Sequence, residues 1–152
     1  MPNWTGNRLF VTGPRQDVER FRQQAAGEGA YKVTKKRKNK DEYEQGCLSF
    51  ERFVPMMKKI ARLSDNAAIT LVERAWGCKW DAEGPVLVTH KPRLLRYEFG
   101  TPWSPPVRWL RRVSRMYPQL AFRMRYGGSE FRGVAEYVNG KGKDQEWYHF
   151  EV

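Results

Sequence analysis

The chain has 152 residues, of which 40% are hydrophobic and 14% aromatic, so it is not a disordered chain and can form one domain with a large core. Lys and Arg number 28 against 17 Asp and Glu, and the resulting net charge of +11 attracts polyanions and excludes an acidic surface overall. No apolar run is long enough to cross a bilayer and no signal peptide is evident, so we expect a cytoplasmic protein.

The first third of the chain predicts a strand, a helix and a charged loop. Residues 7–12 are rich in strand-forming residues, and a helix over about 14–26 follows. The apolar face of that helix comprises Val18, Phe21 and Ala25. Residues 27–46 carry a dense run of charges and little that can be buried, so we expect a mobile basic loop there.

The middle third returns to apolar patterns. Residues 48–54 alternate apolar and polar and stop at Pro55, and residues 56–80 have a helical pattern. The sequence Ser64-Asp65-Asn66 predicts a break in that pattern, with the start of a second helix. The inward face of the second helix is expected to comprise Ile69, Val72 and Trp76.

The last third predicts a sheet, a helix and more sheet. Residues 86–90 and 94–99 flank a turn at Pro92 and are expected to pair as antiparallel strands. A helix over about 105–117 follows, with Ser104 as its N-terminal cap. Its inward residues are expected to be Val107, Leu110 and Val113.

Residues 120–126 alternate cleanly, which places Arg123 and Arg125 on the face opposite the apolar residues Leu120, Phe122, Met124 and Tyr126. A strand over 131–138 leads to a hairpin signal at Asn139-Gly140, and we expect a loop through Asp144 before a last strand over 146–152. These elements predict an α+β fold: a ferredoxin-like antiparallel sheet with helices on one face, extended by a C-terminal β-meander, in a single domain over residues 1–152.

The predicted basic surface has two parts. The helix after the Trp-Pro motif carries four arginines at spacings of three, four and seven, so they share one stripe; these are Arg108, Arg111, Arg112 and Arg115. Like charges at such spacings repel, which indicates an external anion or an acidic neighbour. Arg96, Arg123 and Arg125 are candidates for a second patch on the open face of the sheet. We therefore predict binding through these seven arginines.

No pattern of catalytic residues stands out. His90 and His149 have no recognisable partners, and neither Cys47 nor Cys78 belongs to a metal-binding or redox motif. A disulfide between the two cysteines stays open, although free thiols are favoured in a cytoplasmic protein. The sequence predicts a protein that is not an enzyme and has no metal or small-molecule cofactor.

Three tryptophan-bearing motifs resemble those of the YubB-like proteins of phages, prophages and plasmids. The motifs are Met1-Pro2-Asn3-Trp4, Trp76-Gly77-x-Lys79-Trp80-Asp81 and Phe99-x-Thr101-x-Trp103-Ser104-Pro105-Pro106. The resemblance implies a ferredoxin-like domain of unknown function encoded by a mobile element. We expect the motifs to be architectural, with Trp76 and Trp103 largely buried and Trp80 partly buried.

Two functional interpretations remain open. In the first, the protein binds a host protein or nucleoprotein complex through its basic surface, as a counter-defence (anti-CRISPR) inhibitor of a CRISPR effector would. In the second, it binds nucleic acid directly. Because the residues alternating with the arginines are assigned to the core, no base-stacking aromatic is expected on the open sheet face, and the arginines are expected to contact the phosphate backbone.

Overall fold

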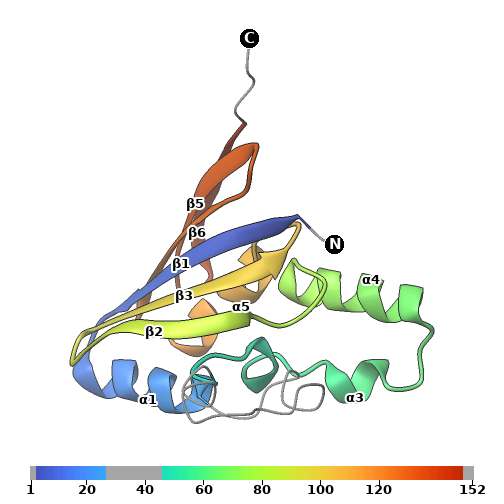
Figure 1. Cartoon of the computed structure of the whole chain (residues 1–152). Coiled ribbons are helices and arrows are strands. Elements are labelled where there is room, and N and C mark those ends of the chain that lie inside the picture. The colour runs from blue at the N-terminus through green and yellow to red at the C-terminus, as the bar shows by residue number, and fades with distance from the viewer. Residues whose placement is uncertain (1–2, 27–45, 149–152) are drawn as a thin grey trace, which may run out of the picture.

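A computed structural model describes residues 3–26 and 46–148 of the chain. The described part forms a six-stranded antiparallel sheet in the order β2-β3-β1-β4-β5-β6 (Figure 1). The elements in chain order are β1 (Trp4–Thr12), α1 (Arg15–Ala25), η2 (Phe50–Arg52), α3 (Met57–Ile60), α4 (Asp65–Trp76), β2 (Glu83–Lys91), β3 (Leu94–Pro102), α5 (Val107–Met116), β4 (Ala121–Gly127), β5 (Phe131–Val138) and β6 (Lys141–Tyr148). The predicted basic loop at about 27–46 lies almost entirely outside the described residues.

The first four strands have the ferredoxin-like arrangement. One helix follows β1 and another follows β3, and β1 lies at the centre between β3 and β4. The hairpin of β5 and β6 continues the sheet beyond β4 and projects away from the helices (Figure 1). The predicted α+β ferredoxin-like fold with a C-terminal meander is therefore confirmed.

The core lies between the sheet and the helical layer and is rich in aromatic rings. Phe21 of α1 packs edge-on against Phe122 of β4, and Phe50 of η2 lies 4.6 Å from the Trp109 ring of α5, centroid to centroid. Trp109 is fully buried, although the sequence pattern did not single it out. Leu110 and Val113 are buried as predicted, whereas Val107 is only half-buried.

The segment that alternates in sequence, residues 48–54, is not a strand. It forms the 3₁₀ turn η2, because the buried carboxylate of Asp81 collects its donors. Ser49 Oγ and the Phe50 backbone N–H each donate to Asp81 at 2.7 Å, and the Glu51 N–H donates at 3.2 Å. A carboxylate that accepts several consecutive donors holds the chain in a tight turn instead of an extended ladder.

The predicted break at Ser64 is confirmed. Ser64 Oγ accepts a hydrogen bond from the Ala67 backbone N–H at 3.3 Å and caps α4, while Gly77 ends the helix in the left-handed conformation. Val72 and Trp76 are buried as expected, but Ile69 is 38% exposed. Figure 1 shows the first turns of α4 extending past the ends of the strands.

Two predictions at the start of α5 are wrong. Ser104 does not cap the helix; its hydroxyl donates to the Gly77 carbonyl at 2.6 Å and so ties the start of α5 to the end of α4. Trp103 is 49% exposed and has a φ of 67°, a left-handed conformation that is rare for a bulky residue. Hydrogen bonds of its backbone with Asn3 and Thr5 hold Trp103 in this conformation, and the indole is exposed.

The β5–β6 connection is shorter than predicted. Asn139 and Gly140 both have positive φ and form a two-residue turn, so that Val138 pairs directly with Lys141. The expected loop through Asp144 is instead part of β6, and the predicted start of the last strand at residue 146 is wrong. Helix α5 fixes the turn, because Ser114 Oγ accepts from the Gly140 N–H at 2.8 Å and the Arg111 Nε donates to the Gly140 carbonyl at 3.1 Å.

Candidate nucleic-acid interface

The face of the sheet that the helices leave uncovered is built by strict alternation. Leu120, just before β4, and Phe122, Met124 and Tyr126 within it are buried as predicted, and Arg123 and Arg125 point to the open face. In β1 the buried residues are Thr5, Asn7, Leu9 and Val11. The open face therefore receives Trp4, Gly6, Arg8, Phe10 and Thr12 from the central strand.

An aromatic side chain lies at the middle of this face, contrary to the expectation from sequence. Phe10 is directly opposite Arg96 of β3 and directly opposite Arg123 of β4, and its ring is half-buried. The expectation failed because it was drawn from the strands that carry the arginines, whereas the ring comes from the strand between them. A partly exposed ring flanked by guanidinium groups is the arrangement that stacks an unpaired base next to its phosphates.

The arginines of the open face differ in their partners. Arg96 and Arg8 share the Glu98 carboxylate, with N–O distances of 2.9 Å and 3.0 Å, and Arg123 pairs with Glu136 at 3.2 Å. Hydrogen bonds from Arg96 and Arg8 lower the pKa of Glu98, so that carboxylate stays ionised.

Arg125 differs from these three arginines. Within residues 3–26 and 46–148 it has no carboxylate partner, and its guanidinium is exposed. It is therefore the predicted site residue on this face whose charge is most available to an external anion.

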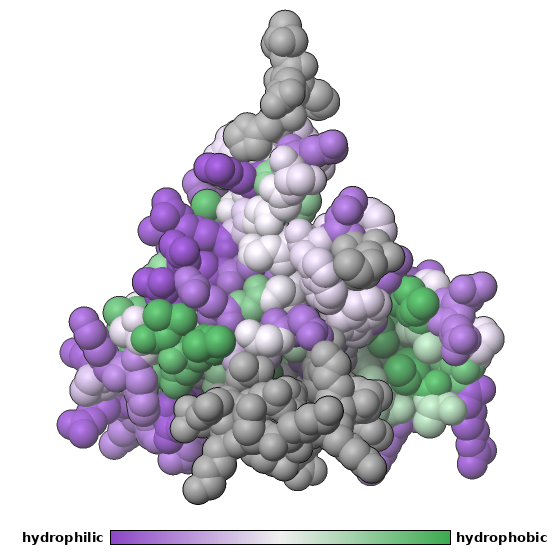
Figure 2. Space-filling model, in the orientation of Figure 1, coloured by the Kyte–Doolittle hydropathy of each residue, from purple (hydrophilic) through white to green (hydrophobic). Residues whose placement is uncertain are grey.

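Twisting of the β5–β6 hairpin turns part of the open face into a groove of about 790 Å³. Phe10, Arg123 and Arg125 contribute to its floor, and Lys141 and Lys143 of β6 contribute to its rim. Hydrophilic side chains gather beside β1 and at the base of the hairpin (Figure 2). The two lysines were missed in the sequence because residues 141–144 were assigned to a loop. In a loop, alternation does not indicate the side of the sheet to which a side chain points.

The four arginines of α5 form a separate surface on the other side of the molecule, as expected for a helix that covers the sheet. All four are exposed, and in the described part of the chain no carboxylate pairs with them; they are Arg108, Arg111, Arg112 and Arg115. Two of them have structural contacts: Arg108 donates to the Arg74 carbonyl at 3.4 Å, and Arg111 holds the β5–β6 turn. Arg112 is free of such contacts.

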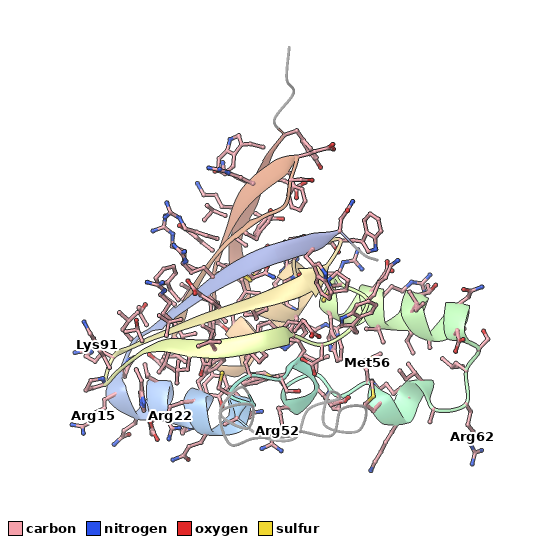
Figure 3. The ribbon with its side chains drawn as sticks, in the orientation of Figure 1. Arg15, Arg22, Arg52, Met56, Arg62 and Lys91 are labelled. Carbon is pink, nitrogen blue, oxygen red and sulfur yellow. The ribbon has the colours of Figure 1, made fainter. Side chains whose placement is uncertain are left out.

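Basic residues also occur elsewhere. Figure 3 shows Arg15 and Arg22 on α1 and Arg52 on η2, all projecting from the helical layer. Arg22 is partly neutralised, because it forms a hydrogen-bonded ion pair with Glu19 that lowers the pKa of that carboxyl group to about 2. The positive charge of the chain is thus spread widely, and the open face is distinguished by the ring among its cations.

The residues weighed for catalysis lie apart from this face or have no activating partner. Burial raises the pKa of Cys47 to about 11, and burial together with the Asp81 charge raises that of Cys78, so both thiols stay protonated and both are free. His90 is exposed on β2, with its Nε2 atom 3.7 Å from Glu19, and His149 lies outside the described residues. Among the residues described, no group of three His, Cys, Asp or Glu side chains is placed to hold a metal ion.

The described helices include none that is both long and apolar enough to cross a membrane. The family described as "Ferredoxin-like domain in Api92-like protein" matches residues 75–151, half of the chain. The chain belongs to this family. The matched residues of this Api92-like protein hold β2 to β6 and α5, whereas β1 with its ring precedes them.

A crystal structure of the protein api92 from Yersinia pseudotuberculosis is similar to this chain over 100% of both chains, with a TM-score of 0.69 and 11% sequence identity. At that identity the similarity shows the fold alone. No curated protein sequence matches the chain.

Proposed function

We propose that this Api92-like protein binds single-stranded nucleic acid across the open face of its sheet. The observation that carries the proposal is Phe10, a half-buried ring opposite Arg96 on one neighbouring strand and opposite Arg123 on the other. A ring in this position offers a stacking surface to an unpaired base. Arg96 and Arg123 beside it are paired with Glu98 and Glu136, so the cation available to an adjoining phosphate is Arg125 on the same face.

Three further features support a single strand as the ligand. The groove of about 790 Å³ is lined by four cations of β4 and β6 and by one carboxylate, Glu136, so positive charge predominates where phosphates would lie. Arg125 has no carboxylate partner in the described residues. The bases of a duplex are already stacked and paired with each other, so none of them is available to stack on Phe10.

The test measures the affinity of fluorescently labelled oligothymidylate, oligouridylate and a duplex of equal length by anisotropy between 50 and 200 mM salt. Replacing Phe10 by Ala should weaken single-strand binding about 5- to 150-fold, because base stacking on an aromatic side chain contributes about 1–3 kcal/mol. The variant Phe10→Tyr should bind like the parent, since it keeps the ring.

The matched charge variants are Arg125→Gln on the open face and Arg112→Gln on α5. Loss of one phosphate contact lowers the slope of log affinity against log salt concentration by about 0.7. The fold loss of affinity caused by Arg125→Gln should therefore be about 2.6 times larger at 50 mM than at 200 mM salt. Arg112→Gln removes the same charge and should leave the slope unchanged. Equal effects of the two variants, or a preference for the duplex, would refute the open face as the binding site.

A second candidate function is the binding of an acidic protein surface by α5. Arg112 and Arg115 border a hollow of about 400 Å³ that also has apolar walls from Phe53, Val54 and Met116. Unpaired cations around an apolar depression suit a partner that presents an apolar side chain flanked by carboxylates. For this partner Arg112→Glu should abolish binding, whereas salt should affect mainly the association rate.

We further propose that the protein is a non-enzymatic accessory protein of a phage or another mobile element, acting in the cytoplasm of the host cell on a nucleoprotein complex such as a CRISPR effector. The motif resemblance to YubB-like proteins supports this setting. The experiment is affinity capture from host lysate with and without nuclease treatment. Host proteins that are retained after nuclease treatment and lost with Arg112→Glu would support a protein target, and capture of nucleic acid alone would oppose it.

A further inference from the structure

A second hollow of about 450 Å³ lies on the open face, on the far side of Arg125 from the groove. Its lining includes Arg8, Glu98, Arg125 and Arg132 around a floor of exposed backbone. Arg125 also lines the groove around Phe10, so the two depressions are continuous.

The hollow is open because its floor has no side chains. Gly6 of β1 is directly opposite Gly100 of β3 and directly opposite Gly127 of β4. Nothing within the described chain requires glycine at position 6: its φ is not in the left-handed region, and an added Cβ would have the Gly127 carbonyl oxygen as its nearest neighbour, at 3.9 Å. Glycine in a strand interior often marks a bulge, a bend or a place where another group approaches the backbone closely, and the pairing of β1 with β3 is regular through Gly6.

Two of the cations around this floor are available to an anion. Arg8 is engaged with the Glu98 carboxylate at 3.0 Å. Arg125 and Arg132 are exposed, and no carboxylate among the described residues pairs with either. The two guanidinium groups come from positions on adjacent strands, β4 and β5, that point to the same face.

An aromatic pair lies at the start of β1, where Trp4 is two residues from Gly6 on the same face of the strand. Trp4 lies against Gly100, whose added Cβ would be 3.6 Å from the indole Cε3 atom, and the Trp80 ring packs edge-on at 6.0 Å from that of Trp4. The two side chains are 43% and 39% exposed. Two contacting indole rings with this much exposed surface, one of them on the same face of β1 as the hollow, offer a stacking surface to an unpaired base.

The backbone of Trp103 holds Trp4 in place from both sides. The Trp103 N–H donates to the Asn3 carbonyl at 2.7 Å, and its carbonyl accepts from Thr5 Oγ1 at 3.0 Å. The left-handed conformation of Trp103 is therefore the conformation that clamps the residues before and after Trp4. Non-glycine residues in this conformation cluster at active sites, ligand clamps and switch regions.

We propose that this hollow binds the continuation of the nucleic-acid strand, with a phosphate between Arg125 and Arg132 and a base stacked on the Trp4–Trp80 pair. The inference rests on the proposed function, because it extends the same strand from Phe10 past Arg125. Phe10 and Trp4 are six residues apart on β1, which separates the two stacking positions by about 20 Å. The binding site therefore spans several nucleotides and ends at the tryptophan pair.

The experiment measures affinity against length for oligothymidylate and oligouridylate, from 2 to about 16 nucleotides, with the parent, Gly6→Val, Trp80→Ala and Trp80→Phe. The Val side chain fills the hollow at a position with room for it, so this variant should fold like the parent, which circular dichroism and thermal unfolding check. For the parent, affinity should rise with length until the strand reaches the tryptophan pair.

For Gly6→Val and Trp80→Ala, the affinity should stop rising at a shorter strand length, and its plateau should be about 5- to 150-fold weaker than that of the parent. Trp80→Phe should give the parental curve, because it keeps an aromatic ring. If the parent binds long strands and both variants follow its curve, the extension into the hollow is wrong and the proposed function stands. If the parent binds neither oligonucleotide, or binds a duplex equally well, both proposals are overturned.

Discussion

Replacing Trp76 and Trp103 separately by alanine tests whether the two tryptophans have different roles, one in packing the core and one at the surface. The Trp76 ring is fully buried, packs edge-on against Phe50 at 5.6 Å, and donates its indole N–H to the Val54 carbonyl at 2.9 Å. Truncation of such a side chain costs about 3–5 kcal/mol, and the orphaned carbonyl places Trp76→Ala at the upper end of that range.

Trp103→Ala should be less costly, because about half of the indole is exposed. Burial of the remaining ~100 Å² contributes at most about 2.5 kcal/mol. Trp103→Gly should then be more stable than Trp103→Ala by roughly 1 kcal/mol, since glycine adopts a positive φ without steric cost.

The measurement is urea unfolding followed by circular dichroism, which does not depend on the removed fluorophore. At about 2–4 °C per kcal/mol, Trp76→Ala should also lower the midpoint of thermal unfolding by about 10–20 °C. Equal destabilisation by Trp76→Ala and Trp103→Ala, or a Trp103→Gly variant less stable than Trp103→Ala, would show that Trp103 is a packing anchor after all.

Two further predictions concern Asp81, which is buried, and Cys47, which is partly buried. Asp81→Ala leaves the Phe50, Glu51 and Ala82 backbone donors unmet and should cost more than about 3 kcal/mol in urea unfolding, with Asp81→Asn intermediate; a neutral Asp81→Ala would contradict its role in shaping η2. Because burial raises the pKa of Cys47 to about 11, its alkylation by iodoacetamide at pH 8 should be over ~100-fold slower in the folded than in the unfolded protein and should rise about tenfold per pH unit up to that pKa. Rapid labelling of the folded protein at pH 8 would place Cys47 in a more open environment.

Much of the fold could be predicted because several segments have one dominant pattern. The alternation around Arg123 and Arg125 fixed the facing of β4, and the cap at Ser64 located the start of α4. The segment before Pro55 was misassigned for a different reason. Its turn depends on hydrogen bonds to Asp81, some 30 residues later, and a window of local periodicity contains no information on such a partner.

The candidate site was only partly predictable. The arginines of the open face followed from alternation within β4, but Phe10 stands beside Leu9 and Val11 in an apolar run, where alternation does not show which residue faces outward. Trp103 was misjudged because a large apolar ring in a Pro-rich frame is usually a core residue, as Trp76 indeed is. The positive φ of Trp103, which turns the ring outward, is visible only in three dimensions.

The positions of the two basic surfaces limit what a single partner can contact. The open face and the α5 stripe lie on opposite sides of the core, since the sheet separates Phe10 from the buried residues that α5 covers. A short single strand bound along β1 cannot reach Arg112, so its affinity should respond to Arg125→Gln alone. A ligand that responds to both Arg125→Gln and Arg112→Gln must wrap around the edge of the sheet or present two surfaces, as a nucleoprotein complex does. Comparing the affinities of these two variants therefore distinguishes a bare strand from an assembled nucleoprotein complex.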